Sequence, residues 1–176
     1  MGVGRIIVLS GSPASGKTTT ASLLQRHLPD PFLHLPLDAF IDMLPPGFDD
    51  ASFERMEVGY HHAVAAVARA GNNVIVDHFR PELDHELYAG PDVLLVGLRC
   101  PLEVLLRREE LRPPERRGFA AAAFPAVHRG RRYDVEVDTS QMSPEECVER
   151  IRGAYGRPRS AFASLRAGVA EQPSGL

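Results

Sequence analysis

The sequence predicts an α/β fold in which a five-stranded parallel sheet is flanked by helices. Short apolar runs alternate with longer segments of helical periodicity, and this alternation is typical of parallel strands joined by right-handed crossovers. The first apolar run, RIIVLS, is followed directly by the glycine-containing stretch GSPASGKT. The 176 residues, 44% of them hydrophobic, suit one packed domain, which we expect over residues 1–155.

The strands are predicted from apolar runs that end at turn residues. RIIVLS is continuous and rich in β-branched residues, which favours a strand buried on both faces. The run YDVEVDT alternates between polar and apolar residues and is therefore expected nearer an edge. The predicted strands are residues 5–10, 32–36, 73–77, 92–100 and 133–139.

The helices are predicted from apolar periodicity and from start and stop signals. Gly71 is a natural end for the longest helix, and Ser143 with Glu146 forms a capping box at the start of the last one. Residues 156–176, rich in Arg, Pro, Ser and Gly, are expected to be a loosely held C-terminal tail. The predicted helices are residues 17–28, 39–44, 53–71, 102–111, 119–128 and 143–155.

The composition argues against several classes of protein. The net charge is −3 with a pI near 6.2, so no overall basic field favours nucleic acid, although HRGRR at 128–132 is a local basic run. The opening MGVGRIIVL is too short an apolar run for a signal peptide or a membrane span. We expect a cytoplasmic protein with reduced Cys100 and Cys147 and without nucleic-acid or membrane partners. The oligomeric state stays open, and a homo-oligomer is compatible with the sequence.

GSPASGKT matches the phosphate-loop pattern G-x-x-x-x-G-K-[ST] and has a strand before it and a helix after it. Glycines let such a loop aim backbone N–H groups at a phosphate, and the following helix adds the positive end of its dipole. Lys17 is expected to reach the β- and γ-phosphates, and Thr18 to place its hydroxyl on Mg²⁺. We therefore expect ATP to be bound by Gly11, Ser12, Pro13, Ala14, Ser15, Gly16, Lys17, Thr18 and Thr19.

Lys17 is the only lysine among the 20 Lys and Arg residues of the chain. Lysine is a compact charge on a slim stem, whereas arginine is a wide planar fork. Only the slimmer side chain is expected to fit inside a closed ring of backbone, which explains a lysine at this one position.

Ligands of a doubly wound sheet lie outside the carboxyl ends of its strands, so residues that follow strands are candidates for the site. Asp38 is the candidate general base for an acceptor hydroxyl, and the alternative is a helix N-cap. Asp77 ends an apolar strand and is expected to hold Mg²⁺ or to orient the acceptor, and the alternative is a solvated strand end. Asp138 and Thr139 are assigned to the pocket for the nucleotide base.

An arginine-rich segment at about residues 102–128 predicts a lid that closes over ATP. Arg108 and Arg112 are four residues apart on one helix face, which makes them the first candidates for catalytic arginines. The alternative is a solvated helix with Arg–Glu pairs. The arginines of this segment are Arg107, Arg108, Arg112, Arg116 and Arg117.

His61, His62 and His78 are expected to have mainly structural roles. His78 is expected to be structural, with acceptor contact as the alternative, while nearby Arg80 is a candidate for binding an anionic substrate. His61 and His62 lie in the middle of a predicted helix, where a core or surface role is expected rather than metal binding. No His, Cys and Asp cluster has the sequence spacing of a zinc site.

Several of these motifs together resemble the chloramphenicol 3-O-phosphotransferase family of P-loop antibiotic kinases, over roughly residues 5–153. They are GSPASGKT, LDAFIDMLP, ARAG, VIVD, LLVGLRC, RREELR and, most specifically, VHRGRRYDVEVDTS at 127–140. The resemblance implies a P-loop kinase fold and ATP-dependent phosphorylation of a drug hydroxyl. It also implies that Asp38 is the catalytic aspartate and that Arg108 and Arg112 are lid arginines.

The sequence departs from the family at the segment 45–57, at HFRPEL after the third strand and in the tail. We therefore expect an enzyme that confers resistance by phosphorylating chloramphenicol or another hydroxylated antibiotic such as hygromycin A. Two alternatives remain. One is a metabolic small-molecule kinase of the shikimate or gluconate type, and the other is a regulatory P-loop ATPase without a small-molecule acceptor.

Overall fold

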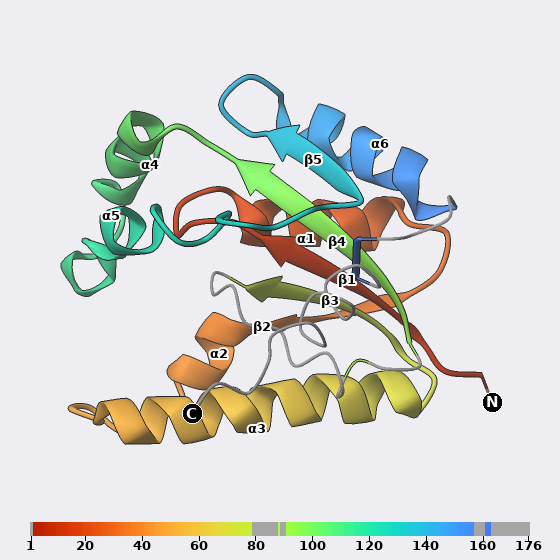
Figure 1. The fold of residues 1–176 in the computed structure, drawn as a ribbon, viewed down its shortest axis with the longest axis horizontal. Helices are drawn as coiled ribbons and strands as arrows, with labels where there is room; N and C mark the ends of the chain where they lie inside the picture. Colours follow the sequence, from red (N-terminus) through yellow and green to blue (C-terminus); the bar gives the residue numbers. More distant parts are fainter. Residues whose placement is uncertain (1, 79–87, 89–90, 157–160, 163–176) are drawn as a thin grey trace, which may run out of the picture.

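The computed structural model describes residues 2–78, 88, 91–156 and 161–162. Within these residues the chain forms an all-parallel sheet of five strands in the order β2-β3-β1-β4-β5 (Figure 1). The predicted fold class is confirmed, and the alternating last strand lies at an edge as expected. The strands are β1 (Arg5–Ser10), β2 (Phe32–Pro36), β3 (Asn73–His78), β4 (Asp92–Arg99) and β5 (Val135–Asp138).

Helices cover both faces of the sheet. On one face, α1 (Lys17–His27) packs beside α6 (Pro144–Tyr155), and on the other α3 (Asp50–Arg69) runs beside α2 (Leu37–Ile41) (Figure 1). Beyond the carboxyl ends of the strands lie α4 (Leu102–Glu109), the 3-10 turn η1 (Pro114–Arg116) and α5 (Phe119–Ala123). Among the residues described, no helix is long and apolar enough to cross a membrane.

The central strand β1 supplies apolar side chains to both layers. Ile6 and Val8 are fully buried in the core under α3, together with Tyr60 and Val64. The alternate residues Ile7 and Leu9 are fully buried in the core under α1 and α6. Because side chains of a strand alternate between faces, a continuous apolar run is what a doubly covered strand requires.

The observed helix limits differ from the predicted ones at several ends. The helix α3 begins at Asp50 rather than at residue 53, because the side chain of Asp49 accepts a hydrogen bond from Ser52 N at 2.8 Å. The capping box of Ser143 and Glu146 is present as predicted. The predicted helix 119–128 is shorter, since α5 ends at Ala123 and the chain continues in turns.

The expectation of a loosely held tail is wrong for the two tail residues that the structure describes after Gly156. Ala161 and Phe162 are buried in the core under α3. Ala161 N donates to Asp134 Oδ1 at 3.0 Å, and Asp134 Oδ2 accepts from Leu95 N at 2.9 Å. This carboxylate therefore joins the tail to strand β4. The remaining residues of the predicted tail lie outside the described residues.

Candidate active site

The phosphate loop joins β1 to α1 at the carboxyl edge of the sheet. Gly16 adopts a φ of 89° and Ala14 a φ of 66°, which turns the loop tightly enough for α1 to begin at Lys17. A Cβ atom at Gly11 would lie 2.5 Å from Ser15 Oγ and 3.0 Å from Leu98 O. Glycine is therefore required at position 11 by close packing and at position 16 by backbone conformation.

Lys17 points into this loop. Its Nζ donates to Gly11 O at 2.8 Å and to Ser12 O at 3.1 Å. The pKa of Lys17 is lowered to about 8, chiefly by burial and to a small extent by the charge of Arg112, while the carboxylates of Asp77 and Asp38 act against this lowering. Asp38, Asp77 and Arg112 thus each act electrostatically on Lys17.

Asp77 is buried beside the start of α1 rather than exposed at a solvated strand end. Its Oδ2 accepts from Thr18 Oγ1 at 3.3 Å and its Oδ1 from Leu37 N at 3.2 Å. Burial would raise the pKa of Asp77, but the nearby His34 imidazole and Lys17 ammonium hold it below its usual value. Thr18 and Asp77 therefore offer a hydroxyl and an ionised carboxylate, the oxygen donors that Mg²⁺ prefers.

Asp38 lies in the first turn of α2, directly after β2. Because the N-cap of α2 is Pro36, the alternative that Asp38 merely caps this helix is wrong. Its Oδ2 accepts from Arg116 Nη1 at 3.1 Å. Arg116 Nη2 also binds both carboxylate oxygens of Asp42, at 2.6 and 2.8 Å. The lid segment thus reaches across to α2 and contacts the candidate base.

Arg108 and Arg112 line one cavity of about 360 Å³, as their predicted common face implies. The cavity extends from the phosphate loop to the loop that follows β5. Arg108 closes one wall, because it donates to Thr139 O at 2.6 Å and to Thr139 Oγ1 at 3.1 Å. The lining of the cavity also includes Gly16, Thr19, Met142 and Cys147.

Asp138 and Thr139 take different places at this cavity. Thr139 is part of the lining of this cavity. The carboxylate of Asp138 instead accepts from Ser140 N at 2.8 Å and from Ser140 Oγ at 2.6 Å. Asp138 therefore shapes the turn after β5, and the observed contacts of its side chain are with that turn.

Sequence reasoning did not single out Arg116, one of five arginines in the lid segment. Spacing on an ideal helix favoured Arg108 and Arg112, whereas Arg116 lies in a separate 3-10 turn that begins at Pro114. The consecutive prolines of LRPPERR are the signal that could have separated it from the others. Arg80, the candidate for anionic substrates, lies outside the described residues.

The segment 127–140 folds back onto the start of the phosphate loop, a placement that its sequence does not reveal. Tyr133 Oη donates to Ser10 Oγ at 3.2 Å and lies 2.8 Å from His128 Nδ1. Burial and the charge of Arg99 lower the pKa of His128 to about 4, so its ring is neutral at pH 7. Gly97 leaves room for this packing, because a Cβ there would lie 2.6 Å from the ring of Tyr133.

Known sequences resemble this chain over most of its length. A sequence model described as chloramphenicol phosphotransferase-like protein matches residues 4–156. A Mycobacterium tuberculosis protein (strain H37Rv), provisionally named an O-phosphotransferase, is 26% identical over 86% of this chain and 82% of the relative.

Several solved structures have a fold similar to that of this chain. The Mycobacterium tuberculosis APS kinase CysC in complex with AMPPNP and APS has a TM-score of 0.70 at 21% identity, covering 89% of this chain and all of that chain. The tunicamycin resistance protein of Deinococcus radiodurans has a TM-score of 0.64 at 22% identity, covering 88% and 97%. At these identities the likeness concerns the fold, which this chain shares with both proteins.

Proposed function

Because the chain belongs to the chloramphenicol phosphotransferase-like family and is an ATP-dependent O-phosphotransferase, we propose that it phosphorylates a hydroxyl group of an antibiotic. The observation that carries this proposal is the arrangement of Lys17, Asp77 and Asp38 at one edge of the sheet, with Arg116 of the lid on Asp38. An enzyme that transfers a phosphoryl group to an alcohol needs this pair of features: a phosphate cradle and a carboxylate across from it.

The nucleotide is proposed to lie along the loop and the neighbouring cavity. The backbone N–H groups of residues 11–18 and the start of α1 would hold the triphosphate, with Lys17 on the β- and γ-phosphates. The base and ribose would extend into the cavity near Arg108 and Thr139. Thr18 and Asp77 would hold Mg²⁺, which neutralises charge on the phosphates when it is bound.

The acceptor is proposed to enter beside Asp38. As the acceptor oxygen bonds to the γ-phosphorus, the bond from that phosphorus to the bridging oxygen of ADP breaks, and Asp38 accepts the hydroxyl proton. Arg112, whose charge already acts on Lys17, is positioned to stabilise the charge on the transferred group. Arg116 would bring the lid over Asp38 and so exclude water.

An antibiotic is proposed as the acceptor on the strength of two similarities. The family takes its description from chloramphenicol phosphotransferase. One protein with a similar fold is a tunicamycin resistance protein. A neutral hydroxylated drug is also compatible with Arg116, the cation beside Asp38, being already paired with Asp38 and Asp42. We propose that phosphorylation by this enzyme confers resistance to such a drug.

A mass-spectrometric acceptor screen tests this function. The protein is incubated with Mg-ATP and a panel of neutral antibiotics and anionic metabolites, and each product is searched for one added phosphoryl group. A phosphorylated antibiotic is the expected result. Phosphorylation of an anionic metabolite alone would replace the proposal by the metabolic kinase, and ATP hydrolysis that no acceptor accelerates would favour the regulatory ATPase.

Variants of the two carboxylates contacted by Arg116 test the proposed base. We expect Asp38→Asn to lower kcat by about a hundredfold or more while nucleotide binding persists, because general-base catalysis contributes roughly 10²–10⁴. Asp42→Asn is the matched control, since Asp42 also binds Arg116 but has no role in proton transfer. Equal turnover of Asp38→Asn and wild type would remove Asp38 from the mechanism.

A further inference from the structure

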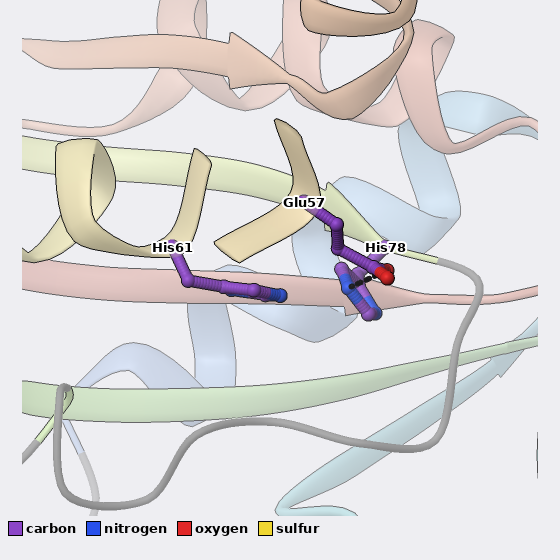
Figure 2. A group of neighbouring side chains, drawn as sticks. All are labelled: Glu57, His61 and His78. Carbon is purple, nitrogen blue, oxygen red and sulfur yellow. Dashed lines mark ion pairs between the residues drawn. The ribbon is translucent and has the colours of Figure 1, made fainter. Parts of the chain in front are cut away.

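A cluster of metal-ligating side chains lies on the α3 side of the sheet. Glu57 and His61 are one turn apart on α3, so they share a helix face, and both point toward His78 at the end of β3 (Figure 2). His78 is fully buried, His61 is 6% exposed, and the Glu57 side chain is 14% exposed. Two histidines and one carboxylate thus lie together in the core, and these are side chains that commonly bind transition metals.

The distances suit one shared ion. One ligand atom from each residue lies within 4.8 Å of the others, and His78 Nε2 is 3.7 Å from Glu57 Oε1. Ligands at 2.0–2.1 Å from a tetrahedral metal are separated by about 3.3 Å, so small side-chain movements bring the three atoms into range. A separation of 3.7 Å is also too long for a hydrogen bond between these two atoms.

A further contact presents His61 as a ligand. Its Nδ1 lies 2.8 Å from the hydroxyl of the buried Tyr88. When Nδ1–H donates to this oxygen, the lone pair of Nε2 is available to a metal, and such a partner of the second ring nitrogen accompanies most metal-bound histidines. With Nδ1–H as the donor, the contact to Tyr88 holds the ring in an orientation that presents Nε2 to the cluster.

We propose that Glu57, His61 and His78 bind a transition-metal ion, with Zn²⁺ as the best match. Two imidazoles and one carboxylate are a donor set that suits Zn²⁺ rather than Mg²⁺ and leaves one position for a further ligand. The bound ion would tie α3 to the end of β3.

This site is separate from the proposed magnesium position, although His78 follows Asp77 directly. Successive side chains of a strand point to opposite faces. Val74 and Val76 belong to the core under α3, the face that His78 shares by alternation, whereas Ile75 and Asp77 face the α1 side. Thr18 at the start of α1 contacts Asp77 accordingly. The proposed zinc site therefore does not depend on the proposed phosphotransferase reaction.

Zinc titration of the metal-free protein tests the proposal. The full-length protein is treated with a chelator, dialysed into excess Mg²⁺ to occupy oxygen sites, and titrated with Zn²⁺, with bound zinc measured by elemental analysis. We expect one equivalent in wild type, and an affinity at least tenfold lower in both Glu57→Gln and His61→Gln. His62→Gln is the matched control, because His62 is the exposed neighbour of His61 and should bind zinc as wild type does.

X-ray absorption of the zinc-loaded wild type keeps the test decisive if a variant fails to fold. The expected first shell has two imidazole nitrogens and carboxylate oxygen. A folded wild type that takes up no zinc would overturn the proposal and leave the cluster as a buried proton-sharing network. Equal zinc affinity in wild type, Glu57→Gln and His61→Gln, or a first shell without two imidazoles, would overturn it as well.

Discussion

The single lysine of the chain shows how one residue type is fixed by its surroundings. Lys17 Nζ lies inside the loop and donates to two backbone carbonyls, of Gly11 and Ser12, while Asp77 and Asp38 act on it from outside. A compact ammonium on a slim stem fits this ring, whereas a planar guanidinium needs more room and a different donor geometry. The arginine-rich composition elsewhere therefore does not extend to this position.

The pKa of Lys17 predicts a proton linkage at the residue scale. The free site holds this pKa at about 8, and bound phosphates should raise it, because negative charge favours the ammonium form. Nucleotide binding near pH 8 is therefore expected to take up about half a proton, and affinity should fall as the pH rises above 8. Calorimetry in two buffers of different ionisation enthalpy measures this uptake.

A variant identifies the group that titrates. Lys17→Met keeps a long unbranched side chain, one atom shorter than lysine, but carries no charge, so its weaker nucleotide binding should lack this pH dependence between pH 7 and 9. The same proton uptake in Lys17→Met and wild type would show that another group is responsible.

At the scale of elements, the lid is held together by one buried carboxylate. Glu109, at the end of α4, is 3% exposed, and its two oxygens accept from Gly118 N at 3.0 Å and Ala120 N at 2.9 Å. These are the first backbone N–H groups of α5, and Ala120 O in turn accepts from Ser12 Oγ of the phosphate loop at 3.2 Å. Glu109 thus connects α4, α5 and the nucleotide site.

Removing this carboxylate should loosen the lid. We expect Glu109→Ala to lower the free energy of unfolding by about 2–3 kcal/mol, because two backbone N–H groups, of Gly118 and the buried Ala120, lose their acceptor. Glu109→Gln should cost less, since its amide oxygen still accepts one bond. Urea denaturation measures both, with Glu110→Ala on the exposed side of α4 as the control. A Glu109→Ala protein as stable as the control would contradict this role.

Arg116 is expected to act on turnover rather than on stability. Its ion pairs with Asp38 and Asp42 are solvent-exposed, so they contribute at most about 1 kcal/mol. If Arg116 brings the lid over Asp38, Arg116→Ala should lower kcat/KM for the acceptor at least tenfold with little change in melting temperature. Arg107→Ala, an exposed arginine of α4, is the matched control. Steady-state kinetics with wild-type values for Arg116→Ala would exclude the lid contact from catalysis.

At the scale of the whole molecule, the two sides of the sheet carry different groups of polar side chains. The α1 side carries Thr18 and Asp77, while the α3 side carries the proposed metal cluster and receives Phe162. Phe162 is 9% exposed, and its ring centroid lies 6.4 Å from that of Tyr88, the partner of His61. Phe162 therefore contributes to the same layer as α3.

Phe162 is predicted to stabilise the whole domain. Phe162→Ala should lower the free energy of unfolding by about 3 kcal/mol, the range for deleting a buried aromatic ring. Phe119→Ala, whose side chain is 56% exposed, should change it by less than about 0.5 kcal/mol. Denaturant unfolding of the full chain compares the two. Equal stability of these variants would mean that the docked tail adds nothing to the core.

Sequence alone determined the fold class and the phosphate loop, because both depend on local chemistry. Periods of two and of 3.6 residues distinguish strands from helices, and Gly11, Gly16, Lys17 and Thr18 act within one turn of chain. The places of Asp38 and Asp77 followed as well, since parallel strands bring their carboxyl ends to one edge. Their roles in catalysis and in binding Mg²⁺ remain predictions.

Tertiary structure decided the contacts between segments that are distant in sequence. Arg116 meets Asp38, and His78 meets Glu57 and His61, only because the lid folds over α2 and because α3 packs on β3. The spacing of residues along the chain does not indicate contacts between distant segments. For this reason the sequence predicted no metal-binding role for His61. Periodicity reports which face a residue occupies, whereas only packing of whole elements decides which faces meet.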